Sequence, residues 1–539
     1  MTTALLLDCT LRDGAYVIDK KFGDGVINGI IDGLVKAGMD IVEIGFLQDD
    51  GFGPGKTVFL NSKEAQRFIP EQRGNTSFAV LADYSRYSIE NLDEYDGKSF
   101  DAVRVCFFKH ERYDVLRYFK IVQEKGYRLF VQPVDILGYT DTELIELIEM
   151  VNEIEPYCFS IVDTFGSMYE EDLQRVFYII DHNLCPASQI GFHSHNNMQM
   201  SSGLSQFFLR MALGHRGAVV DATISGMGRG AGNTPTELIA QYMVSKLHCH
   251  YDIDTLLDLI DNYIYPIRSR ATWGYTTEMF LAGAYGAHVN NIAFLKNKNS
   301  IRSKDIRFIL NEVGPIARKR YHYDLLEDIY QNLLRSDIDD SENFERLKAA
   351  MSNRTVLVLA PGKTATTEAD RVREYIQRNK AVVIAINFIP EELTADYLYM
   401  NNVKRYEVFC RRTNRTPVKK ILTSNVTCQQ DDDTFIISFN RLYKCGWQHS
   451  DNSAILLLRL VDALNVKQIG IAGLDGYDPE TSGRNNYARD NLALPSNSQS
   501  SILANREIAE MLQDYFATRK LQVKVDFVTT SRFAEKYYD

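Results

Sequence analysis

From residue 4 to about residue 228, a short apolar run alternates with a stretch that has the apolar spacing of a surface helix. Short continuous apolar runs suit strands buried on both faces, and an intervening helix lets consecutive strands pair in parallel. Eight such runs favour a (β/α)8 TIM barrel over an open doubly wound sheet. The expected strands are Leu5–Leu11, Ile41–Phe46, Ser77–Ala82, Ala102–Phe107, Leu129–Val134, Phe159–Asp163, Ile190–His195 and Val219–Ser225, and the clearest helices are Gly25–Ala37, Val115–Lys125, Asp141–Ile154 and Glu171–Asp181.

The chain of 539 residues exceeds what one hydrophobic core of ~250–300 residues organises, so more than one domain is expected. We expect a catalytic barrel over 1–275, a helical extension over 276–345 and a Rossmann-like α/β domain over 350–539. In the last region, apolar runs alternate with helix-like stretches again. The strands expected there are Thr355–Leu359, Ala381–Ile386, Phe435–Ser438, Gln468–Ala472 and Val523–Phe527, with helices at Glu368–Arg378 and Ser453–Leu464.

Composition excludes some classes of protein. The net charge of -11 argues against a nucleic-acid partner, because a phosphate-binding surface usually needs a basic excess. The eight cysteines form no Cys-x-x-Cys pair, so neither a zinc ribbon nor a disulfide scaffold is indicated. The N-terminus lacks the basic region of a signal peptide, and no apolar stretch approaches the ~20 residues that span a bilayer. We therefore expect a cytoplasmic protein without a membrane partner, and a homo-oligomer.

Polar residues gather where the expected barrel strands end, which is where barrel enzymes carry their chemistry. His193 and His195 are two residues apart on one strand, so both imidazoles point to the same face. Asp13, at the end of the first strand, can add a carboxylate oxygen. Two imidazoles and a carboxylate leave open positions on a divalent metal, and the carboxylate and keto oxygens of a 2-oxo acid can fill them.

Two further charged residues lie at neighbouring strand ends. Arg12 offers a permanent positive charge for the oxygen of an enolate, and Glu43 on the next strand can hold Arg12 in place. The alternative is a purely structural ion pair low in the barrel. After the eighth strand, the Gly-rich stretch 226–232 predicts a tight turn that brings Asn233 near the site, with phosphate binding as the alternative.

Together these segments resemble the DRE-TIM metallolyase superfamily over about residues 1–290. The resemblance implies that Asp13, His193 and His195 hold Mn²⁺ or Mg²⁺, with Asn233 as a further ligand. It also implies that Arg12 stabilises the enolate and that Glu43 orients Arg12. The matching segments are Asp8-Cys9-Thr10-Leu11-Arg12-Asp13-Gly14, Glu43, Gly191-Phe192-His193-Ser194-His195-Asn196 and Gly226-Met227-Gly228-Arg229-Gly230-Ala231-Gly232-Asn233.

The Gly-rich segment 226–233 is most similar to that of the 4-hydroxy-2-oxovalerate aldolase branch, and Tyr275 resembles a substrate-facing tyrosine of that branch. One departure concerns the base. That branch has a histidine two residues after the glycine of Arg-Asp-Gly, whereas this chain has Tyr16 there. Tyrosine is a weak base at an ordinary pKa of about 10. His110, just past the fourth strand, is a second candidate for the base, with a solvated loop histidine as the alternative.

The C-terminal region carries a candidate phosphate site. Pro361, Gly362 and Lys363 lie at a strand-to-helix turn, where backbone N–H groups can bind phosphate, and Asp475 follows another strand. This region weakly resembles archaeal pterin diphosphokinase-like proteins and some bacterial sialyltransferases. The resemblance implies a nucleotide or a sugar phosphate as partner. The alternative is an oligomerisation or regulatory domain.

The sequence therefore predicts a metal-dependent aldolase whose small-molecule substrates are a 2-oxo acid and an aldehyde. The two resemblances together suggest a place in sugar-acid or surface-polysaccharide metabolism. One alternative is an acyl-CoA-dependent Claisen synthase of the isopropylmalate synthase type. The other is a non-catalytic barrel that serves as a scaffold for the C-terminal domain.

Overall fold

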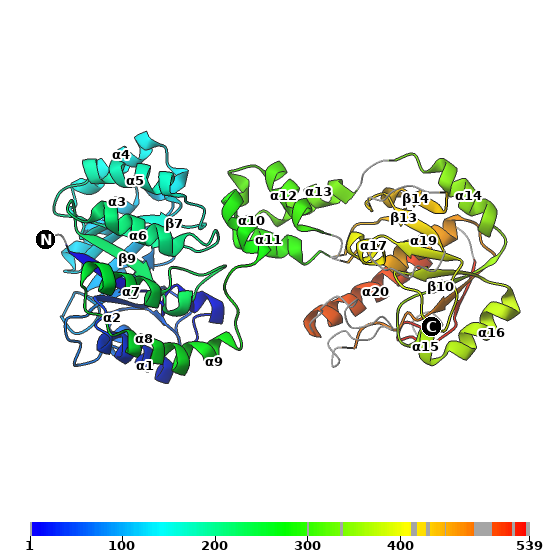
Figure 1. Cartoon of the computed structure of the whole chain (residues 1–539), viewed down its shortest axis with the longest axis horizontal. Helices are drawn as coiled ribbons and strands as arrows, with labels where there is room; N and C mark the ends of the chain where they lie inside the picture. The colour runs from blue at the N-terminus through cyan, green and yellow to red at the C-terminus, as the bar shows by residue number, and fades with distance from the viewer. Residues whose placement is uncertain are drawn as a thin grey trace. The chain divides into compact units, whose positions relative to one another are not determined.

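The structure, a computed structural model, divides the chain into two compact units (Figure 1). The first comprises Met1–Ile292 and Pro315–Tyr321, and the second comprises Ala293–Gly314 and His322–Asp539. The helices expected to form a separate extension over 276–345 are therefore shared between the two units, and the domain boundaries stay a prediction. The structure describes residues 3–298, 301–334, 338–410, 418–426, 432–447, 449–478, 498–519 and 523–534.

In the first unit, eight parallel strands close into a barrel, which confirms the expected TIM barrel. β1 pairs with both β9 and β2 and so completes the circle, while the short strand β3 (Val58–Phe59) pairs beside β2. The barrel strands are β1 (Ala4–Asp8), β2 (Ile41–Leu47), β4 (Ser77–Asp83), β5 (Ala102–Phe107), β6 (Arg128–Pro133), β7 (Cys158–Asp163), β8 (Gln189–Ser194) and β9 (Ala218–Ala222).

Two strands are shorter than predicted, and both shortenings shape the site. The apolar pattern of the first strand continues to Leu11, but β1 ends at Asp8. The backbone N–H groups of Arg12 and Asp13 both donate to the carbonyl of Cys9, so the chain already turns there. The last barrel strand likewise ends three residues before the predicted Ser225.

Helices follow the strands and cover the barrel (Figure 1). Local sequence fixes where they begin: the Thr140 hydroxyl accepts from the Glu143 N–H, and the Glu143 carboxylate accepts from the Thr140 N–H, which is a capping box. All four predicted helices are present within two residues of their expected ends. The helices around the barrel are α1 (Asp24–Lys36), α2 (Ser62–Gln66), α3 (Val115–Glu124), α4 (Asp141–Asn152), α5 (Glu170–Asn183), α6 (Ser201–Ala212), α7 (Thr236–Leu247) and α8 (Ile253–Leu259).

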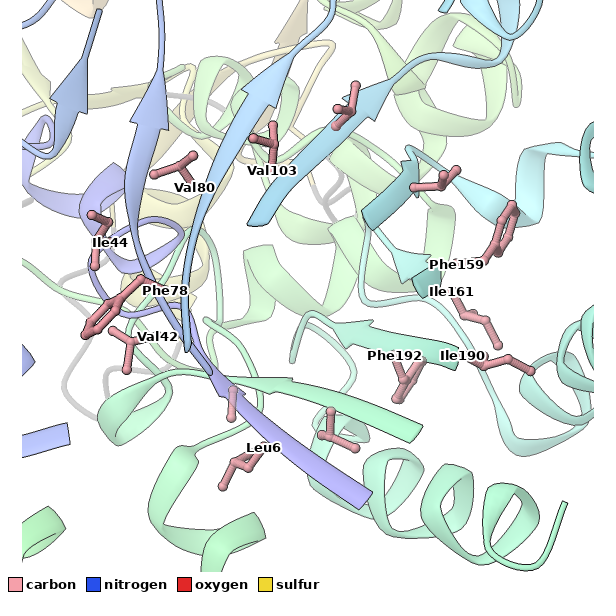
Figure 2. Packing of buried hydrophobic residues seen from close by; sticks show 14 of the residues in the cluster. Leu6, Val42, Ile44, Phe78, Val80, Val103, Phe159, Ile161, Ile190 and Phe192 are labelled. Atoms are coloured by element: carbon pink, nitrogen blue, oxygen red, sulfur yellow. The ribbon is translucent and has the colours of Figure 1, made fainter. Parts of the chain in front are cut away.

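The two faces of each strand carry different side chains, because successive residues of a strand point in opposite directions. The outward set packs against the helices; Val42 and Phe78, for example, are register partners on neighbouring strands (Figure 2). The inward set forms a separate buried cluster that makes an apolar floor inside the barrel. This cluster contains Leu7, Cys9, Ile41, Ala79, Ala102, Phe130, Cys158 and Val219.

On three strands, the next inward side chain above this floor is charged. Glu43 follows Ile41 by two residues, Arg104 follows Ala102, and Asp221 follows Val219. All three polar side chains are buried. The barrel therefore places a layer of charge directly above an apolar layer, on the side where the strands end.

The second unit contains a seven-stranded parallel sheet, which confirms a second α/β domain. Its strand order reverses between β10 and β15, as in doubly wound sheets. The strands β12 and β13 were not predicted, because β12 is short and β13 begins with two lysines. The sheet order is β14 (Thr434–Ile437), β13 (Lys419–Thr423), β12 (Tyr397–Met400), β11 (Val382–Ile386), β10 (Thr355–Leu359), β15 (Gln468–Ala472) and β16 (Lys524–Phe527).

The helices expected at Glu368–Arg378 and Ser453–Leu464 are confirmed as α16 (Ala369–Asn379) and α19 (Ser453–Ala463). Helix α8 runs directly into one π-helical turn, Ile260–Ile264. No helix among the described residues is both long and apolar enough to cross a membrane. The later helices of eight or more residues are α10 (Thr277–Tyr285), α11 (Val289–Lys296), α12 (Ser303–Val313), α13 (Tyr323–Leu334), α14 (Ser341–Met351), α16 (Ala369–Asn379), α17 (Val403–Cys410), α19 (Ser453–Ala463) and α20 (Ser498–Thr518).

Asp8, the last residue of β1, is a fully buried carboxylate. It accepts from the Thr236 hydroxyl at 2.6 Å and from the Thr10 N–H at 2.9 Å. Burial raises the pKa of Asp8 to about 6, although these hydrogen bonds lower it. Because this pKa lies above the ordinary value, ionisation of Asp8 costs more free energy in the folded chain than in the unfolded chain.

We therefore predict that Asp8 contributes most to stability below about pH 4 and that this contribution is lost as the pH rises through about 6. Asp8→Asn removes the titration and keeps an oxygen that can accept from Thr10. Relative to the natural chain, the variant should gain on the order of 2 kcal/mol in free energy of unfolding between pH 4 and pH 7. Denaturant unfolding at both pH values measures this gain, and an equal difference at the two pH values would contradict it.

Candidate metal centre and active site

Asp13, His193 and His195 meet at the end of the barrel where the strands finish. Each offers one ligand atom, and these atoms all lie within 4.8 Å of one another. The two imidazole rings stand edge to face, with centroids 5.1 Å apart. Asp13 comes from the turn after β1, and the histidines come from the end of β8 and the residue just past it, so two segments far apart in sequence converge here.

His193 is held in one orientation by a carboxylate that the sequence reading did not single out. Its Nδ1 lies 2.9 Å from Oδ2 of Asp221, which is the inward residue of β9. Its Nε2 lies 3.6 Å from Oδ2 of Asp13. A carboxylate that accepts from one imidazole nitrogen directs the other nitrogen toward a metal, which is the usual support for a metal-binding histidine.

Arg12 is buried between two carboxylates. Its Nη1 lies 2.5 Å from Oδ2 of Asp13, and its Nε lies 2.7 Å from Oε2 of Glu43. Both carboxylates raise the pKa of Arg12 well above its ordinary value, although burial lowers it, so the guanidinium stays charged. The predicted contact between Glu43 and Arg12 is present in this geometry.

A second arginine, Arg104, closes the arrangement into a ring. This fully buried residue of β5 donates to Oε2 of Glu43 at 2.8 Å and also pairs with Asp221. The sequence could have indicated Arg104 as a site residue, because it is the one charged residue in the apolar strand β5. The ring runs from Asp13 through Arg12, Glu43, Arg104, Asp221 and His193 back to Asp13.

The electrostatics of the three candidate ligands suit a cation. Burial raises the pKa of Asp13, but Arg12 and the imidazoles lower it further, so the net pKa lies well below its ordinary value. Burial lowers the pKa of His195 to about 4, which leaves a neutral imidazole. Burial also lowers the pKa of His193, yet its hydrogen bonds to Asp13 and Asp221 raise it overall. A divalent cation takes the place of a proton on such ligands.

Asn233 offers a fourth candidate ligand atom, its side-chain amide oxygen. Its Nδ2 donates to Oδ1 of Asp13 at 3.0 Å and to the Met227 carbonyl at 3.3 Å. Its Oδ1 is buried and has no hydrogen-bond partner among the described residues. One carboxylate oxygen, two imidazole nitrogens and one free amide oxygen together fit a divalent cation.

The glycines of the loop 226–232 leave the space that lets the Asn233 side chain reach Asp13. A Cβ on Gly228 would lie 2.2 Å from Nδ2 of Asn233, and a Cβ on Gly232 would lie 1.9 Å from the Gly226 carbonyl. Gly232 also has φ +85°, which side chains with a Cβ rarely adopt. The expected tight turn is therefore the role that the geometry supports.

Arg12, Asp13, His193 and His195 line a cavity of about 170 Å³. Pockets for drug-sized ligands usually have ~300–1,000 Å³, so this one suits a smaller molecule. Its walls join candidate metal ligands, cationic groups and apolar side chains, including Arg12, Asp13, Tyr16, Leu81, Cys106, Gln132, Val162, Phe165, His193, His195, Asn197, Arg229 and His288.

Tyr16 lines the cavity where the family pattern has its base. Burial raises the pKa of Tyr16 to about 12. Its ring packs edge to face on Phe46, and the Arg229 guanidinium lies 4.2 Å from the ring centroid on Tyr16. Since the phenol stays protonated at neutral pH, Tyr16 can donate a hydrogen bond but is a poor base.

Two other predicted residues are not brought to the cavity. His110 is exposed and stacks on Phe108, with ring centroids 5.9 Å apart. Tyr275 is 59% exposed. Neither lines the cavity, so their predicted roles as base and substrate-facing tyrosine gain no support from the geometry.

His288 is a cavity residue that the sequence reading missed. Burial, with a contribution from Arg229, lowers the pKa of His288 to about 4. Its Nδ1 accepts from the backbone N–H of Asn290 at 3.1 Å, so Nε2 carries the proton. No motif marks this residue, because it reaches the barrel from the segment between α10 and α11.

In the second unit, the predicted phosphate site is occupied by the chain itself. The Asp475 carboxylate accepts from the Thr364 N–H at 2.9 Å and from the Thr364 hydroxyl. A Cβ on Gly362 would lie 2.5 Å from Cγ of Asp475, so the two segments pack tightly. Lys363 is exposed and Pro361 is partly exposed. The turn therefore binds an internal carboxylate where phosphate was expected, and a nucleotide or sugar-phosphate partner stays a prediction.

We predict that Asp221→Asn weakens divalent-metal binding by about 10-fold to 100-fold, because His193 loses its carboxylate partner. Isothermal titration with Mn²⁺ measures this affinity. Asp40→Asn is the matched control, since Asp40 is a partly buried carboxylate at the start of β2 that binds the Leu6 N–H and the Tyr251 hydroxyl. The control should keep the natural affinity; equal affinities for Asp221→Asn and the natural chain would contradict the role of Asp221.

The family model described as HMGL-like matches residues 110–262. A 4-hydroxy-2-oxovalerate aldolase from Thermomicrobium roseum is 27% identical over 357 residues, which cover 62% of this chain and 93% of that protein. An oxaloacetate decarboxylase from Mycobacterium tuberculosis is 25% identical over 260 residues, covering 47% of this chain and 74% of that protein.

Among solved structures, an HMG-CoA lyase from Brucella melitensis has a TM-score of 0.41 to this chain at 16% identity. It covers 50% of this chain, and the match spans 100% of that protein.

Proposed function

We propose that this chain is a metal-dependent aldolase that acts beside a 2-oxo acid, because the HMGL-like family model matches residues 110–262 and a 4-hydroxy-2-oxovalerate aldolase is 27% identical over 357 residues. In this proposal the enolate of pyruvate adds to an aldehyde, or the reverse reaction releases both. The observation that carries the proposal is the convergence of Asp13, His193 and His195 on a small cavity that Arg12 also lines. The relatives named 4-hydroxy-2-oxovalerate aldolase support this reaction class.

Asp13, His193, His195 and Asn233 would hold the divalent metal, Mn²⁺ or Mg²⁺. When bound, such a cation draws electrons from the keto oxygen of a 2-oxo acid and so favours the enolate. Asp13 contributes the charge of the ligand set, and Asp221 fixes the imidazole of His193 through a 2.9 Å contact. Asp221 is in this account a positioning residue.

Arg12 would supply the fixed positive charge for the developing enolate oxygen. A guanidinium that is already desolvated and held between two carboxylates does not reorganise when the charge develops, which makes its stabilisation effective. Glu43 acts through Arg12 and is therefore also a positioning residue. The hydrogen bond from Arg12 to Asp13 further ties this charge to the ligand set.

Tyr16 would donate a hydrogen bond to the oxygen of the aldehyde, which gains negative charge as the carbon–carbon bond forms. A raised pKa of about 12 keeps the phenol protonated for this role at neutral pH. This assignment replaces the sequence-based interpretation of Tyr16 as a base. His110 is left without a role in the reaction because it is exposed outside the cavity.

The narrower predictions stay proposals. They are the place in sugar-acid or surface-polysaccharide metabolism, the cytoplasmic location and the homo-oligomeric state. The acyl-CoA-dependent synthase and the non-catalytic scaffold are separated from the aldolase by experiment. Release of free thiol from acetyl-CoA with a 2-oxo acid would favour the synthase, and absence of metal binding would favour the scaffold.

We predict metal-dependent exchange of the methyl protons of pyruvate in D₂O, followed by NMR with Mn²⁺ or Mg²⁺. His193→Ala should abolish exchange because it removes a metal ligand. Arg12→Met should slow exchange by roughly 100-fold to 1,000-fold, which is the usual cost of one oxyanion donor. Arg12→Lys keeps the charge without the paired N–H geometry and should lie between Arg12→Met and the natural enzyme.

His110→Ala is the matched control for His193→Ala, because the histidine it removes is exposed outside the cavity. It should exchange pyruvate protons at the natural rate. Exchange that survives in His193→Ala, or that disappears equally in His110→Ala, would contradict the assigned site.

A further inference from the structure

A second cavity of about 720 Å³ adjoins the metal cavity. Tyr16 and Arg229 line both cavities, and the Arg229 guanidinium lies over the Tyr16 ring at 4.2 Å from its centroid. These two stacked side chains therefore form the shared wall. A ligand whose reacting carbon lies beside Tyr16 in the first cavity can extend past this wall into the second.

Four basic side chains line the second cavity: Lys20, Lys56, Arg86 and Arg229. They come from loops that follow four different strands of the barrel, β1, β2, β4 and β9. All of these loops lie at the end of the barrel where the strands finish, which is also the end that carries the candidate metal ligands. Cations from four segments thus converge on one hollow beside the reaction site.

Most of these cations form no ion pair with a carboxylate among the residues that the structure describes. Nζ of Lys20 donates to the neutral amide oxygen of Gln48 at 2.8 Å, and Nζ of Lys56 donates to the Gly51 carbonyl at 3.1 Å. Arg229 forms no ion pair among the described residues and rests on an aromatic ring. Of the four, Arg86 alone has an ion pair within the described part of the chain, a contact of 3.5 Å with Asp83.

Three aspartates also line this cavity, but they do not neutralise the lysines by direct contact. Asp49 is engaged by other donors: the Ser88 N–H at 3.0 Å and the Asn91 amide at 3.0 Å. Asp19 and Asp50 are exposed, and neither forms an ion pair among the residues that the structure describes. The lysine and Arg229 charges therefore remain available to a ligand.

The backbone holds Lys20 in an unfavourable conformation. Asp19 and Lys20 have φ of 51° and 62°, in the left-handed region that residues with a Cβ seldom adopt. The Lys20 carbonyl accepts from the Thr57 N–H at 3.0 Å, which ties this turn to the segment that carries Lys56. Strain kept at two consecutive residues is a common mark of a functional position.

The positive charges that line the second cavity also repel one another. Burial, Arg86, Lys56 and Arg229 all lower the pKa of Lys20, and only Asp50 acts in the other direction among the main contributions. An anion between these side chains would relieve their mutual repulsion. Charge-assisted hydrogen bonds from lysine and arginine are the strong contacts that proteins use for phosphate and carboxylate groups.

We propose that the second cavity binds an anionic group, a phosphate or a carboxylate, on the aldehyde substrate while the aldehyde carbon reaches the metal cavity. This inference rests on the proposed aldolase function and names its missing substrate class. Arg229 and Tyr16 lie between the two binding regions and set the distance from the anionic group to the carbonyl.

The test compares kcat/KM for pairs of aldehydes of which one carries an anionic group, D-glyceraldehyde against D-glyceraldehyde 3-phosphate and butanal against succinic semialdehyde. The natural enzyme should prefer at least one anionic aldehyde by tenfold or more. Lys20→Met and Lys56→Met should each reduce that preference by about tenfold, the usual effect of one hydrogen bond to a charged group. Lys21→Met is the matched control, since Lys21 is the exposed neighbour of Lys20 and does not line the cavity.

Pyruvate proton exchange in the same variants separates this inference from the proposed function. Lys20 and Lys56 do not line the metal cavity, so exchange should keep its natural rate in both variants. Equal kcat/KM for neutral and anionic aldehydes, or an anionic preference that both variants keep, would overturn the inference even when exchange is normal.

If the natural chain fails to exchange pyruvate protons, the proposed function fails and the anion site is tested by binding. Inorganic phosphate, followed by ³¹P NMR line width, should bind the natural chain more tightly than the Lys20→Met/Lys56→Met double variant. Equal line widths for the two proteins would overturn the anion site itself.

Discussion

A buried ring of alternating charges holds the candidate site in place. Asp13, Arg12, Glu43, Arg104, Asp221 and His193 contact one another in that order, and the last returns to the first. Burying charges is costly, and removing one member of a buried pair leaves its partner uncompensated, which costs on the order of 3–5 kcal/mol. The ring therefore tolerates little displacement, and it orients both the guanidinium of Arg12 and the imidazole of His193.

The barrel supports this ring by its alternation of inward side chains. An apolar floor below the ring excludes water, so the ion pairs act in a medium where they are strong. The ring contains two guanidinium groups and three carboxylates, so these five groups alone carry one excess negative charge. A divalent cation beside Asp13 would offset that excess. The same layer of inward side chains thus holds the buried ion pairs and the groups to which the proposed chemistry is assigned.

Much of the fold followed from sequence because each barrel strand is a distinct apolar run between amphipathic helices. The convergence of the three candidate ligands was also predictable, since His193 and His195 share a strand face and Asp13 follows another strand end. Arg104 and Asp221 were missed although each is a lone charge in an apolar strand. His288 could not be found this way, because it reaches the cavity from beyond the barrel strands. In the second unit, the turn at Pro361–Lys363 was expected to bind phosphate. Instead the Asp475 carboxylate, more than a hundred residues later in the chain, accepts from the Thr364 N–H there.

The central claim is that Asp13, His193 and His195 bind one divalent metal within the ring. Anomalous diffraction from crystals of the full chain grown with Mn²⁺ tests it most directly. The account predicts one strong peak per chain within bonding distance of Asp13 Oδ, His193 Nε2 and an imidazole nitrogen of His195, with Asp221 still bound to Nδ1 of His193. A peak elsewhere, or a cavity that stays free of Mn²⁺ at saturating concentration, would contradict it.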